Sequence, residues 1–184
     1  MRVETTTGDR LLTYAADIRN VYADAFAAPP WAEDAAMADA YLDRLAIDVL
    51  RPGFAAAVAL DGERLIGFCT AWTTPDPFPE DRCYPEVSAA LGAPRTRAWL
   101  CGGQEVDELA VHSRGRGKGV GAALLDVVSR DVSDGRTWLL TSVRARAALD
   151  FYRRLGWRQA THPAPEGTGV AVFLGPRHHA ELPV

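Results

Sequence analysis

The sequence predicts a single α/β domain, and three observations support this prediction. A length of 184 residues suits one domain, which would bury roughly 70% of its unfolded surface. Apolar residues follow strand-like patterns in some segments and helical spacing in others. Near the middle, a short apolar run leads through a glycine-rich connection into an amphipathic helix. Together these patterns predict a sheet flanked by helices.

The first third of the chain predicts an edge strand, two helices and a β-hairpin. These elements are expected over residues 2–6, 13–26, 32–50, 54–60 and 63–73. The helices show apolar residues at helical spacing, and Met37 and Tyr41 are among those expected on the inner face of the second. The Asp61-Gly62 pair between the last two segments is a strong signal for a two-residue hairpin turn.

Residues 74–97 predict a long ordered loop, because prolines recur through them. One helical turn is expected inside it, near Pro85 to Leu91. The remaining chain predicts strands and helices in alternation, ending in two strands. These strands are expected near residues 105–112, 137–143, 157–161 and 169–175.

Composition and charge argue against several classes of partner. The hydrophobic content of 48% and charged content of 24% are ordinary for a soluble globular protein. A net charge of −4 argues against nucleic acid or a membrane surface as partner. The first residues do not resemble a secretory signal, and no apolar run approaches the ~20 residues of a membrane span.

Cysteine and histidine usage predicts a cytoplasmic protein without a metal. Cys69, Cys83 and Cys101 lack any paired spacing, which indicates reduced thiols. The four histidines, His162 among them, show no spacing typical of metal ligands. The pair His178-His179 is interpreted as part of a solvated tail.

The central glycine-rich connection predicts a site for a phosphate or pyrophosphate. Arg116, Gly117, Lys118, Gly119 and Gly121 run directly into the amphipathic helix, whose apolar face begins at Val120 and includes Ala123 and Leu124. Glycines at a helix start let an anion approach unpaired backbone N–H groups, and the helix dipole favours negative charge there. Two basic side chains, one of them the only lysine of the chain, add positive charge.

Three kinds of anion-binding loop contain such glycines. A P-loop requires a hydroxyl residue after its lysine, but Gly119 follows Lys118. Gly117, Gly119 and Ala122 match the Rossmann fingerprint formally, but the preceding strand stops near Val111 instead of running into the first glycine. The third pattern is a strand, a connection of five residues, and R-G-x-G-x-G opening a helix. It closely resembles the acyl-coenzyme-A loop of the GNAT superfamily of N-acetyltransferases.

A second motif, residues 148–157, strengthens the resemblance. Its sequence is similar to the A-x-x-F-Y-x-x-x-G-[FW] signature that closes the coenzyme site of that family. It predicts a short helix that ends at Gly156, with Phe151 packed in the core. One position departs from the family: Ala145 replaces an asparagine, which leaves that contact to Arg144 or Arg146.

The resemblance implies a fold and a cofactor. The fold is a single-domain, mixed and curved sheet of about six to seven strands, flanked by about four helices and split between its central parallel strands. The N-acetyltransferase domain would occupy residues 1–184, with a coenzyme-binding core over 105–157 and acceptor-side elements over 13–50 and 74–97. Acetyl-coenzyme A is the implied co-substrate, and the protein is expected to be a monomer or homodimer. The implied coenzyme-binding residues are Leu109, Ala110, Val111, Arg116, Gly117, Lys118, Gly119, Val120, Gly121, Ala122 and Tyr152.

The same resemblance suggests catalytic roles. The Val111 amide would polarise the thioester carbonyl, and the Tyr152 phenol would protonate the leaving thiolate. The general base is expected among Glu105, Asp107 and Glu108, with Asp107 narrowly favoured. Strand alternation would place Glu105 and Asp107 on one face and Glu108 on the other, unless a bulge changes the parity.

These roles predict an enzyme that transfers an acetyl group from acetyl-coenzyme A to a primary amine. Direct attack in a ternary complex on a small molecule is the leading hypothesis. Acetylation of a protein N-terminus or lysine is the alternative within the same class. A module that binds acyl-coenzyme A without turnover is the alternative of another class. Acidic residues around 33–43 and 80–86 could attract a cationic acceptor or could simply be solvated helix faces.

Overall fold

The computed structural model describes residues 1–161 and 169–182 of the chain. It forms two compact units. Unit 1 consists of residues 1–72 and 106–130, and unit 2 of residues 73–105 and 131–184. The boundary passes through the strand β4 (Gln104–Val111), whose first two residues belong to unit 2.

Unit 1 is built on four neighbouring strands in the order β1-β2-β3-β4. The first three, β1 (Arg2–Thr6), β2 (Ala55–Asp61) and β3 (Arg64–Thr73), pair antiparallel in sequence. Gly62, in the turn between β2 and β3, has φ +64°, as the Asp61-Gly62 hairpin requires. The helices of this unit are α1 (Gly8–Leu12), α2 (Ala15–Phe26), α3 (Ala35–Asp48) and α6 (Val120–Ser129), with a 3₁₀ turn η2 (Ser113–Gly115) before α6.

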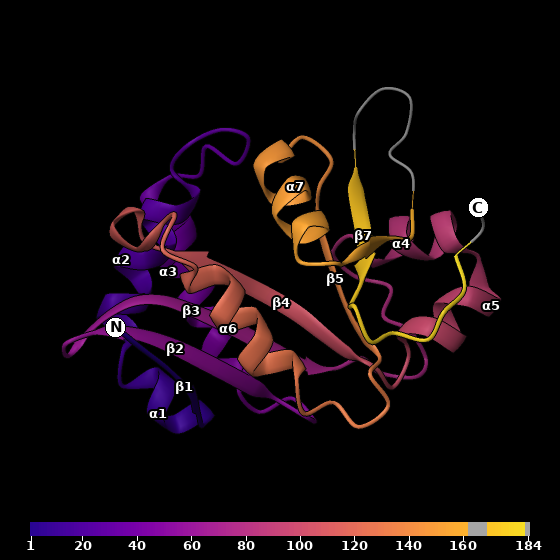
Figure 1. Cartoon of the computed structure of the whole chain (residues 1–184), viewed down its shortest axis with the longest axis horizontal. Coiled ribbons are helices and arrows are strands. Elements are labelled where there is room, and N and C mark those ends of the chain that lie inside the picture. The colour runs from indigo at the N-terminus through magenta and orange to yellow at the C-terminus, as the bar shows by residue number, and fades with distance from the viewer. Residues whose placement is uncertain (162–168, 183–184) are drawn as a thin grey trace. The chain divides into compact units, whose positions relative to one another are not determined.

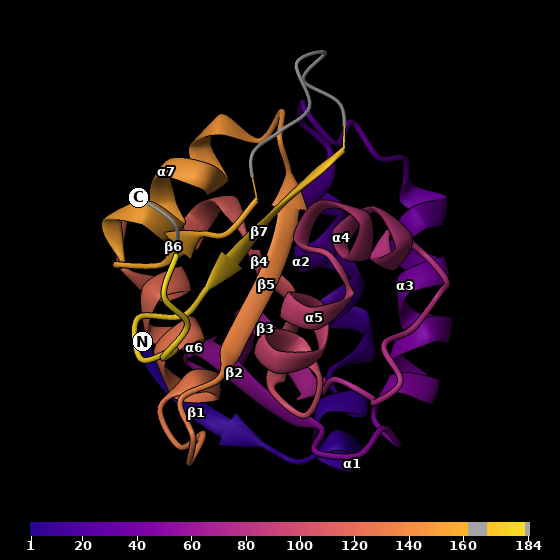
Figure 2. The same ribbon diagram turned by 90° about the vertical axis from the view of Figure 1, so that its right-hand side faces the viewer.

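Helices cover both faces of the unit 1 strands (Figures 1 and 2). Alternate residues of β2, such as Val58, join side chains of α1, α2 and α3 in one apolar cluster. Helix α6 contacts β1 and β2. It also lies close to β3 at Gly67, where an added Cβ would come within 3.1 Å of Leu124. A glycine is therefore needed there for α6 to pack this closely.

Unit 2 holds three strands in the order β5-β7-β6, all antiparallel. They are β5 (Thr137–Ser142), β6 (Arg158–Gln159) and β7 (Val170–Leu174). The Gln104 N–H at the start of β4 donates to the Arg136 carbonyl just before β5, at 2.7 Å. The two strands therefore begin side by side and run parallel, which makes the sheet mixed.

The helices of unit 2 lie on opposite sides of β5 and β7 (Figure 2). Helix α4 (Tyr84–Leu91) packs with Trp138 and Val172 in one apolar cluster. Helix α7 (Arg146–Arg154) contributes Tyr152, whose ring lies 5.6 Å from that of Phe173 on the other face of β7. The short helix α5 (Ala93–Arg95) and a π-helical turn (Thr96–Leu100) complete the unit.

The predicted α/β fold class is confirmed, with seven strands among the described residues. The expected number of about four helices is wrong, because the described part of the chain has seven α-helices. Helix α5 lies where prolines predicted a loop, and α4 coincides with the helical turn expected near Pro85 to Leu91; Pro85 and Pro94 occupy the first turns of these helices. Proline needs no N–H partner at these positions.

The inner face of α3 differs from the predicted one. Met37 is 45% exposed and Ala38 is buried in its place, whereas Tyr41 and Leu45 are buried as predicted. The Asp34 side chain caps this helix by accepting from the N–H groups of residues 36 and 37, so Met37 lies in the first turn. None of the described helices is long and apolar enough to cross a membrane.

Candidate functional site

The connection between β4 and α6 forms an open cradle of backbone N–H groups. Gly117 and Gly119 have φ values of +72° and +76°, and Gly119 is the N-cap of α6. The first bond of the helix runs from the Ala123 N–H to the Gly119 carbonyl, at 3.0 Å. The N–H groups of residues 120–122 precede that bond and so have no partner within the helix. A Cβ added at Gly117 or Gly119 would meet no atom within 4 Å, so the space beside the backbone is open.

Two exposed cations flank this cradle. The Lys118 side chain has no ion pair or hydrogen bond with any residue that the structure describes. Arg116 Nη2 donates to the carbonyls of Asp24 and Ala25, at 3.1 and 3.4 Å. The sequence predicts a pyrophosphate site here, and backbone donors, a helix N-terminus and two cations are groups that bind such an anion. We call residues 116–122 the anion loop.

The last residues of β4, just before the anion loop, have a backbone that is fixed by burial and by a hydrogen bond to β3. Ala110 is fully buried, whereas Leu109 and Val111 are half-buried. The His112 N–H donates to the Ile66 carbonyl of β3 at 2.9 Å, which anchors the end of β4. The role of the Val111 amide stays a prediction.

Glu105 is buried in unit 2 and is held by a tyrosine. Its exposure is 2%, and the Tyr84 hydroxyl of α4 lies 2.9 and 3.0 Å from its two carboxylate oxygens. Sequence analysis did not reveal this partner, because Tyr84 lies 21 positions earlier. The hydrogen bond favours the ionised carboxylate, whereas burial opposes it.

Asp107 and Glu108 both face one arginine of α3. Arg44 Nη2 lies 3.7 Å from Asp107 Oδ2 and 3.7 Å from Glu108 Oε2. Simple strand alternation, which places these two neighbours on opposite faces, is therefore wrong at this point of β4. Arg44 also lies 3.6 Å from Asp48, which accepts from Arg51 at 2.5 Å. Three carboxylates and two guanidiniums make up this group of charges, which we call the Arg44 cluster.

Buried neighbours of the Arg44 cluster are affected by its negative charge. Burial, and then the charges of Glu108 and Asp107, raise the pKa of the Tyr41 phenol. The same causes raise the pKa of the Cys69 thiol on β3. Both groups therefore stay neutral at ordinary pH. Burial disfavours a charge of either sign, so only the contribution of the two carboxylates favours a cation here.

Tyr152 is packed among aromatic rings of unit 2. It is 9% exposed, and its ring lies 6.2 Å from Trp157 and 5.3 Å from Phe151. Phe151 is only half-buried, so the expectation that it fills the core is wrong. The helical face turns Tyr152 inward instead. Gly156, with φ +80°, follows the end of α7 as predicted.

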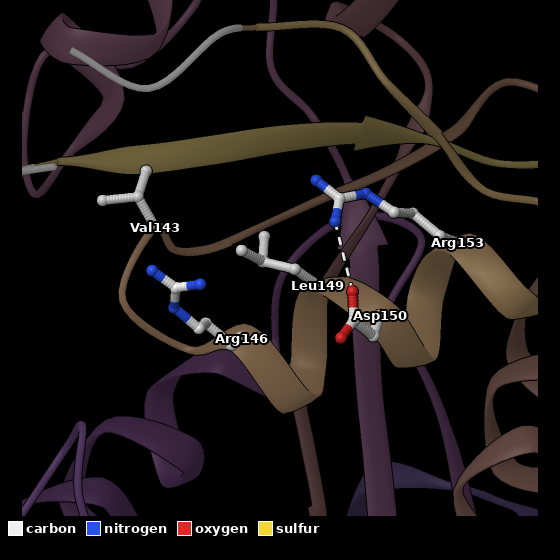
Figure 3. Close-up of a pocket in the computed structure, with 5 residues that line it drawn as sticks. All are labelled: Val143, Arg146, Leu149, Asp150 and Arg153. Atoms are coloured by element: carbon white, nitrogen blue, oxygen red, sulfur yellow. Dashed lines mark hydrogen bonds and ion pairs between the residues drawn. The ribbon is translucent and has the colours of Figure 1, made fainter. Parts of the chain in front are cut away.

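Helix α7 also borders a cavity of about 240 Å³ (Figure 3). Its lining residues are Val143, Arg146, Leu149, Asp150 and Arg153. Figure 3 shows both guanidiniums directed toward the apolar Leu149 side chain, with Arg153 paired to Asp150 at 3.2 Å. Arg146 has no ion pair with the described residues, so it is available to a ligand.

The position where the family has asparagine is structurally distinct here. Ala145 is the N-cap of α7 and is 2% exposed, and it offers no side-chain hydrogen bond. An asparagine would cap the helix at this position. Arg144 lies beside it and uses its N–H to contact the Ser142 hydroxyl at 3.2 Å. Of the two arginines named as replacements, Arg146 is the one that lines the cavity.

Histidines and cysteines form no metal cluster among residues 1–161 and 169–182. His162 lies outside the described residues. The prediction of a solvated tail is wrong for His178, which is 3% exposed. Its Nε2 lies 2.9 Å from the Trp99 carbonyl, and its Nδ1 accepts from the Ala180 N–H at 3.0 Å.

Comparison with known families supports the resemblance found in the sequence. The model of the Acetyltransferase (GNAT) domain matches residues 52–159, more than half of the chain. A comparison with curated proteins finds no match.

Solved structures show the same fold at low sequence identity. The histone acetyltransferase HPA2 and related acetyltransferase of Corynebacterium glutamicum is 20% identical with a TM-score of 0.61, covering 95% of this chain and 94% of that one. PaiA N-acetyltransferase of Thermoplasma acidophilum, in complex with coenzyme A, is 13% identical with a TM-score of 0.57, covering 94% and 98%. Aminoglycoside 6'-acetyltransferase type Ii is 17% identical with a TM-score of 0.58, covering 95% and 96%.

Proposed function

The chain belongs to the GNAT acetyltransferase family, and on this basis we propose that it transfers an acetyl group from acetyl-coenzyme A to a primary amine. The acceptor would be a small molecule that attacks directly in a ternary complex. One observation carries the proposal: the anion loop, whose two left-handed glycines leave helix N-terminal N–H groups open beside two cations.

The residues present fit the coenzyme. The N–H groups of the anion loop would hold its pyrophosphate, with Arg116 and Lys118 neutralising charge. When bound, the coenzyme supplies an activated acetyl thioester. The open space beside Gly117 and Gly119 supports this assignment, because a side chain at either position would fill it.

The backbone and side chains near β4 would then handle charge and protons. The Val111 N–H would donate to the developing oxyanion, a contribution typically of ~10²–10³ in rate. An amine with a pKa of ~10.4 is protonated at neutral pH and must lose a proton before attack. Asp107 remains our candidate for that base, and Glu105 and Glu108 are the alternatives. Tyr152 is the candidate acid for the thiolate.

The Arg44 cluster supports a cationic acceptor. Its carboxylates would attract an ammonium group and would help to hold it near β4. Their charge is consistent with a small amine and equally with a lysine or N-terminus of a protein. An assay of thiol release with amines and with peptides separates these two kinds of acceptor. Three cysteines without disulfide partners suit a reducing compartment, which supports a cytoplasmic location.

Two measurements test the proposal. Calorimetry of coenzyme A should show binding to the wild type, and Arg116→Ala should weaken it by about 1.5–3 kcal/mol, the range for hydrogen bonds to charged groups. Arg114→Ala is the matched control: it removes an exposed arginine that hydrogen-bonds to the described residues through its backbone N–H alone. Equal affinity in wild type and Arg116→Ala would contradict the assignment of the loop.

The second measurement is release of free thiol from acetyl-coenzyme A with a panel of amines and peptides. Turnover with small amines supports the proposal, and turnover only with peptides would identify a protein acetyltransferase. Tight binding of acetyl-coenzyme A without turnover of any acceptor would favour a non-catalytic binding module.

A further inference from the structure

One carboxylate of α2 connects that helix to the turn before the anion loop. Asp24 Oδ2 accepts from the Ser113 N–H at 2.6 Å, and Asp24 Oδ1 accepts from the Ser113 hydroxyl at 3.0 Å. Both contacts join residues 89 positions apart in sequence. Ser113 begins the 3₁₀ turn η2, which runs directly into Arg116 and the loop glycines. A single side chain therefore fixes where the loop starts.

The same carboxylate lies close to the arginine of the loop. Arg116 Nη2 is 3.8 Å from Asp24 Oδ2, and it donates to the backbone carbonyls of Asp24 and Ala25. These carbonyls lie in the last turn of α2, where the helix dipole favours a cation. The contacts all use Nη2, and a guanidinium has five N–H donors, so others remain for an anion. Asp24 and α2 thus hold Arg116 while leaving it able to bind.

The ionisation of Asp24 supports this arrangement. Burial opposes the charge, but hydrogen bonds from Ser113 and the nearby His112 and Arg116 outweigh it and lower the pKa of Asp24. In a separate contact, the His112 Nδ1 accepts from the Arg114 N–H at 3.1 Å and helps to close the turn. The two hydrogen bonds from Ser113 to the Asp24 carboxylate are charge-assisted, and such bonds are shorter and stronger than neutral ones.

We propose that Asp24 is a positioning residue for coenzyme binding, which acts by holding η2 and Arg116 in the arrangement that receives the pyrophosphate. The inference rests on the proposed function, because it takes the anion loop as the coenzyme site. It adds a residue outside the loop, on a helix whose sequence gave no sign of such a role. It also links the coenzyme site to α2, the first helix of the acceptor-side segment.

The direction in which coenzyme affinity changes when the Asp24 charge is removed separates a positioning role from simple electrostatic repulsion. A carboxylate near a phosphate site repels the phosphates, so loss of its charge alone would tighten coenzyme binding. Loss of a positioning contact has the opposite effect, because the loop must then be ordered when the ligand binds. Asp24→Asn keeps the size of the side chain and removes the charge, and it presents an N–H₂ group to donors.

The experiment is calorimetry of coenzyme A with the full chain. We expect Asp24→Asn to raise the Kd about tenfold, equivalent to about 1.4 kcal/mol. The control is Asp17→Asn, which removes a carboxylate from α2 two turns earlier, on roughly the same face, and should leave the Kd within twofold. In steady-state assays, Asp24→Asn should raise the KM for acetyl-coenzyme A and leave kcat nearly unchanged.

A double-mutant cycle with Ser113→Ala identifies the contact. Ser113→Ala should raise the Kd by about threefold. The double variant should bind no worse than Asp24→Asn alone, because both changes act on the same contact between the Ser113 hydroxyl and Asp24. Unfolding by urea without ligand should show that Asp24→Asn remains folded. If the wild type binds no coenzyme A, the proposed function fails. If the wild type binds and Asp24→Asn binds equally or more tightly, the positioning role of Asp24 is overturned.

Discussion

The anion loop and the acidic segment of β4 (residues 105–108) were both predicted from sequence as functional, and the structure treats them in opposite ways. In the loop, the backbone donors at the start of α6 remain open. In the acidic segment, every carboxylate is engaged: Glu105 with Tyr84, and Asp107 and Glu108 with Arg44. We therefore expect function in the first region to depend on backbone groups, and in the second on side chains with distant partners.

The two regions therefore have different structural requirements. Open N–H groups need only glycines that adopt positive φ and a helix that begins after them, and both are local properties. A carboxylate that acts as a base needs a controlled charge environment, which here comes from α3 and α4. The loop should therefore be sensitive to backbone changes, and the acidic segment to changes in charge.

The largest effect is expected from Gly119→Val, which tests the backbone half of the comparison. Valine at φ +76° is strained, and its side chain would enter the open space beside the helix N-terminus. We expect the affinity for coenzyme A to fall more than about 100-fold, or over about 2.7 kcal/mol. Calorimetry measures this loss.

Gly62→Val is a matched control for that variant. Gly62 has φ +64° and, like Gly119, no atom within 4 Å of an added Cβ, but it lies in the β2–β3 turn. Both variants should lose a similar ~1–2 kcal/mol of unfolding free energy from backbone strain. Only Gly119→Val should lose coenzyme binding. Equal coenzyme affinity in the two variants would show that the loop backbone does not contact the ligand.

The second largest effect is expected from Asp107→Asn, which tests whether a side chain of the acidic segment acts as the general base. If Asp107 removes the proton of the amine, kcat/KM should fall by about 10², the lower end for a general base. Activity should partly recover at high pH, where the free amine is abundant. Pre-steady-state or steady-state rates across pH 6–10 measure this.

Glu105→Gln and Glu108→Gln are the parallel variants. Either one could show the larger loss and the pH recovery, which would transfer the role of base to that residue. Full activity and an unchanged pH profile in all three variants would mean that no carboxylate of the segment is the base. The proton would then leave through ordered water.

A smaller effect is expected from Tyr152→Phe. The change keeps the ring packing against Phe173 and Trp157, so the protein should stay folded and keep its coenzyme affinity. The kcat should fall by about tenfold, less than typical acid catalysis, because a thiolate with a pKa of ~8.5 leaves readily. Tyr14→Phe, in α2's N-cap position, is the control. If Tyr152→Phe keeps the wild-type kcat under conditions where the chemical step limits the rate, Tyr152 has a structural role only.

The fold was largely predictable because its signals are local. Periodicity located α2, α6 and the β2–β3 hairpin, and the loop glycines located the start of α6. The helix α5 was missed, and α4 was expected only as a single turn, because Pro85 and Pro94 signal both a loop and a first helical turn. The Tyr84–Glu105 and Arg44–Asp107 pairs were missed for a different reason. Side-chain partners from separate elements depend on packing, which no spacing in the sequence encodes.

The smallest effect is expected at His178, where the pH dependence of the unfolding free energy tests a side-chain environment that the sequence did not predict. Burial lowers the pKa of this imidazole, against the opposing hydrogen bond to the Trp99 carbonyl. The unfolded chain therefore binds a proton more readily than the folded one. The contribution of His178 to stability is full above its ordinary pKa of about 6.5 and is lost as pH falls toward the lower folded value.

The free energy of unfolding should therefore fall between pH 7 and pH 5, by about 1.4 kcal/mol for each unit that separates the two pKa values. His178→Gln should remove this part of the pH dependence, because glutamine does not titrate. His179→Gln, at the exposed neighbour, should retain it. Urea unfolding of the three proteins at each pH measures the slopes. Equal slopes for wild type and His178→Gln would mean that His178 becomes protonated as easily in the folded chain as in the unfolded one.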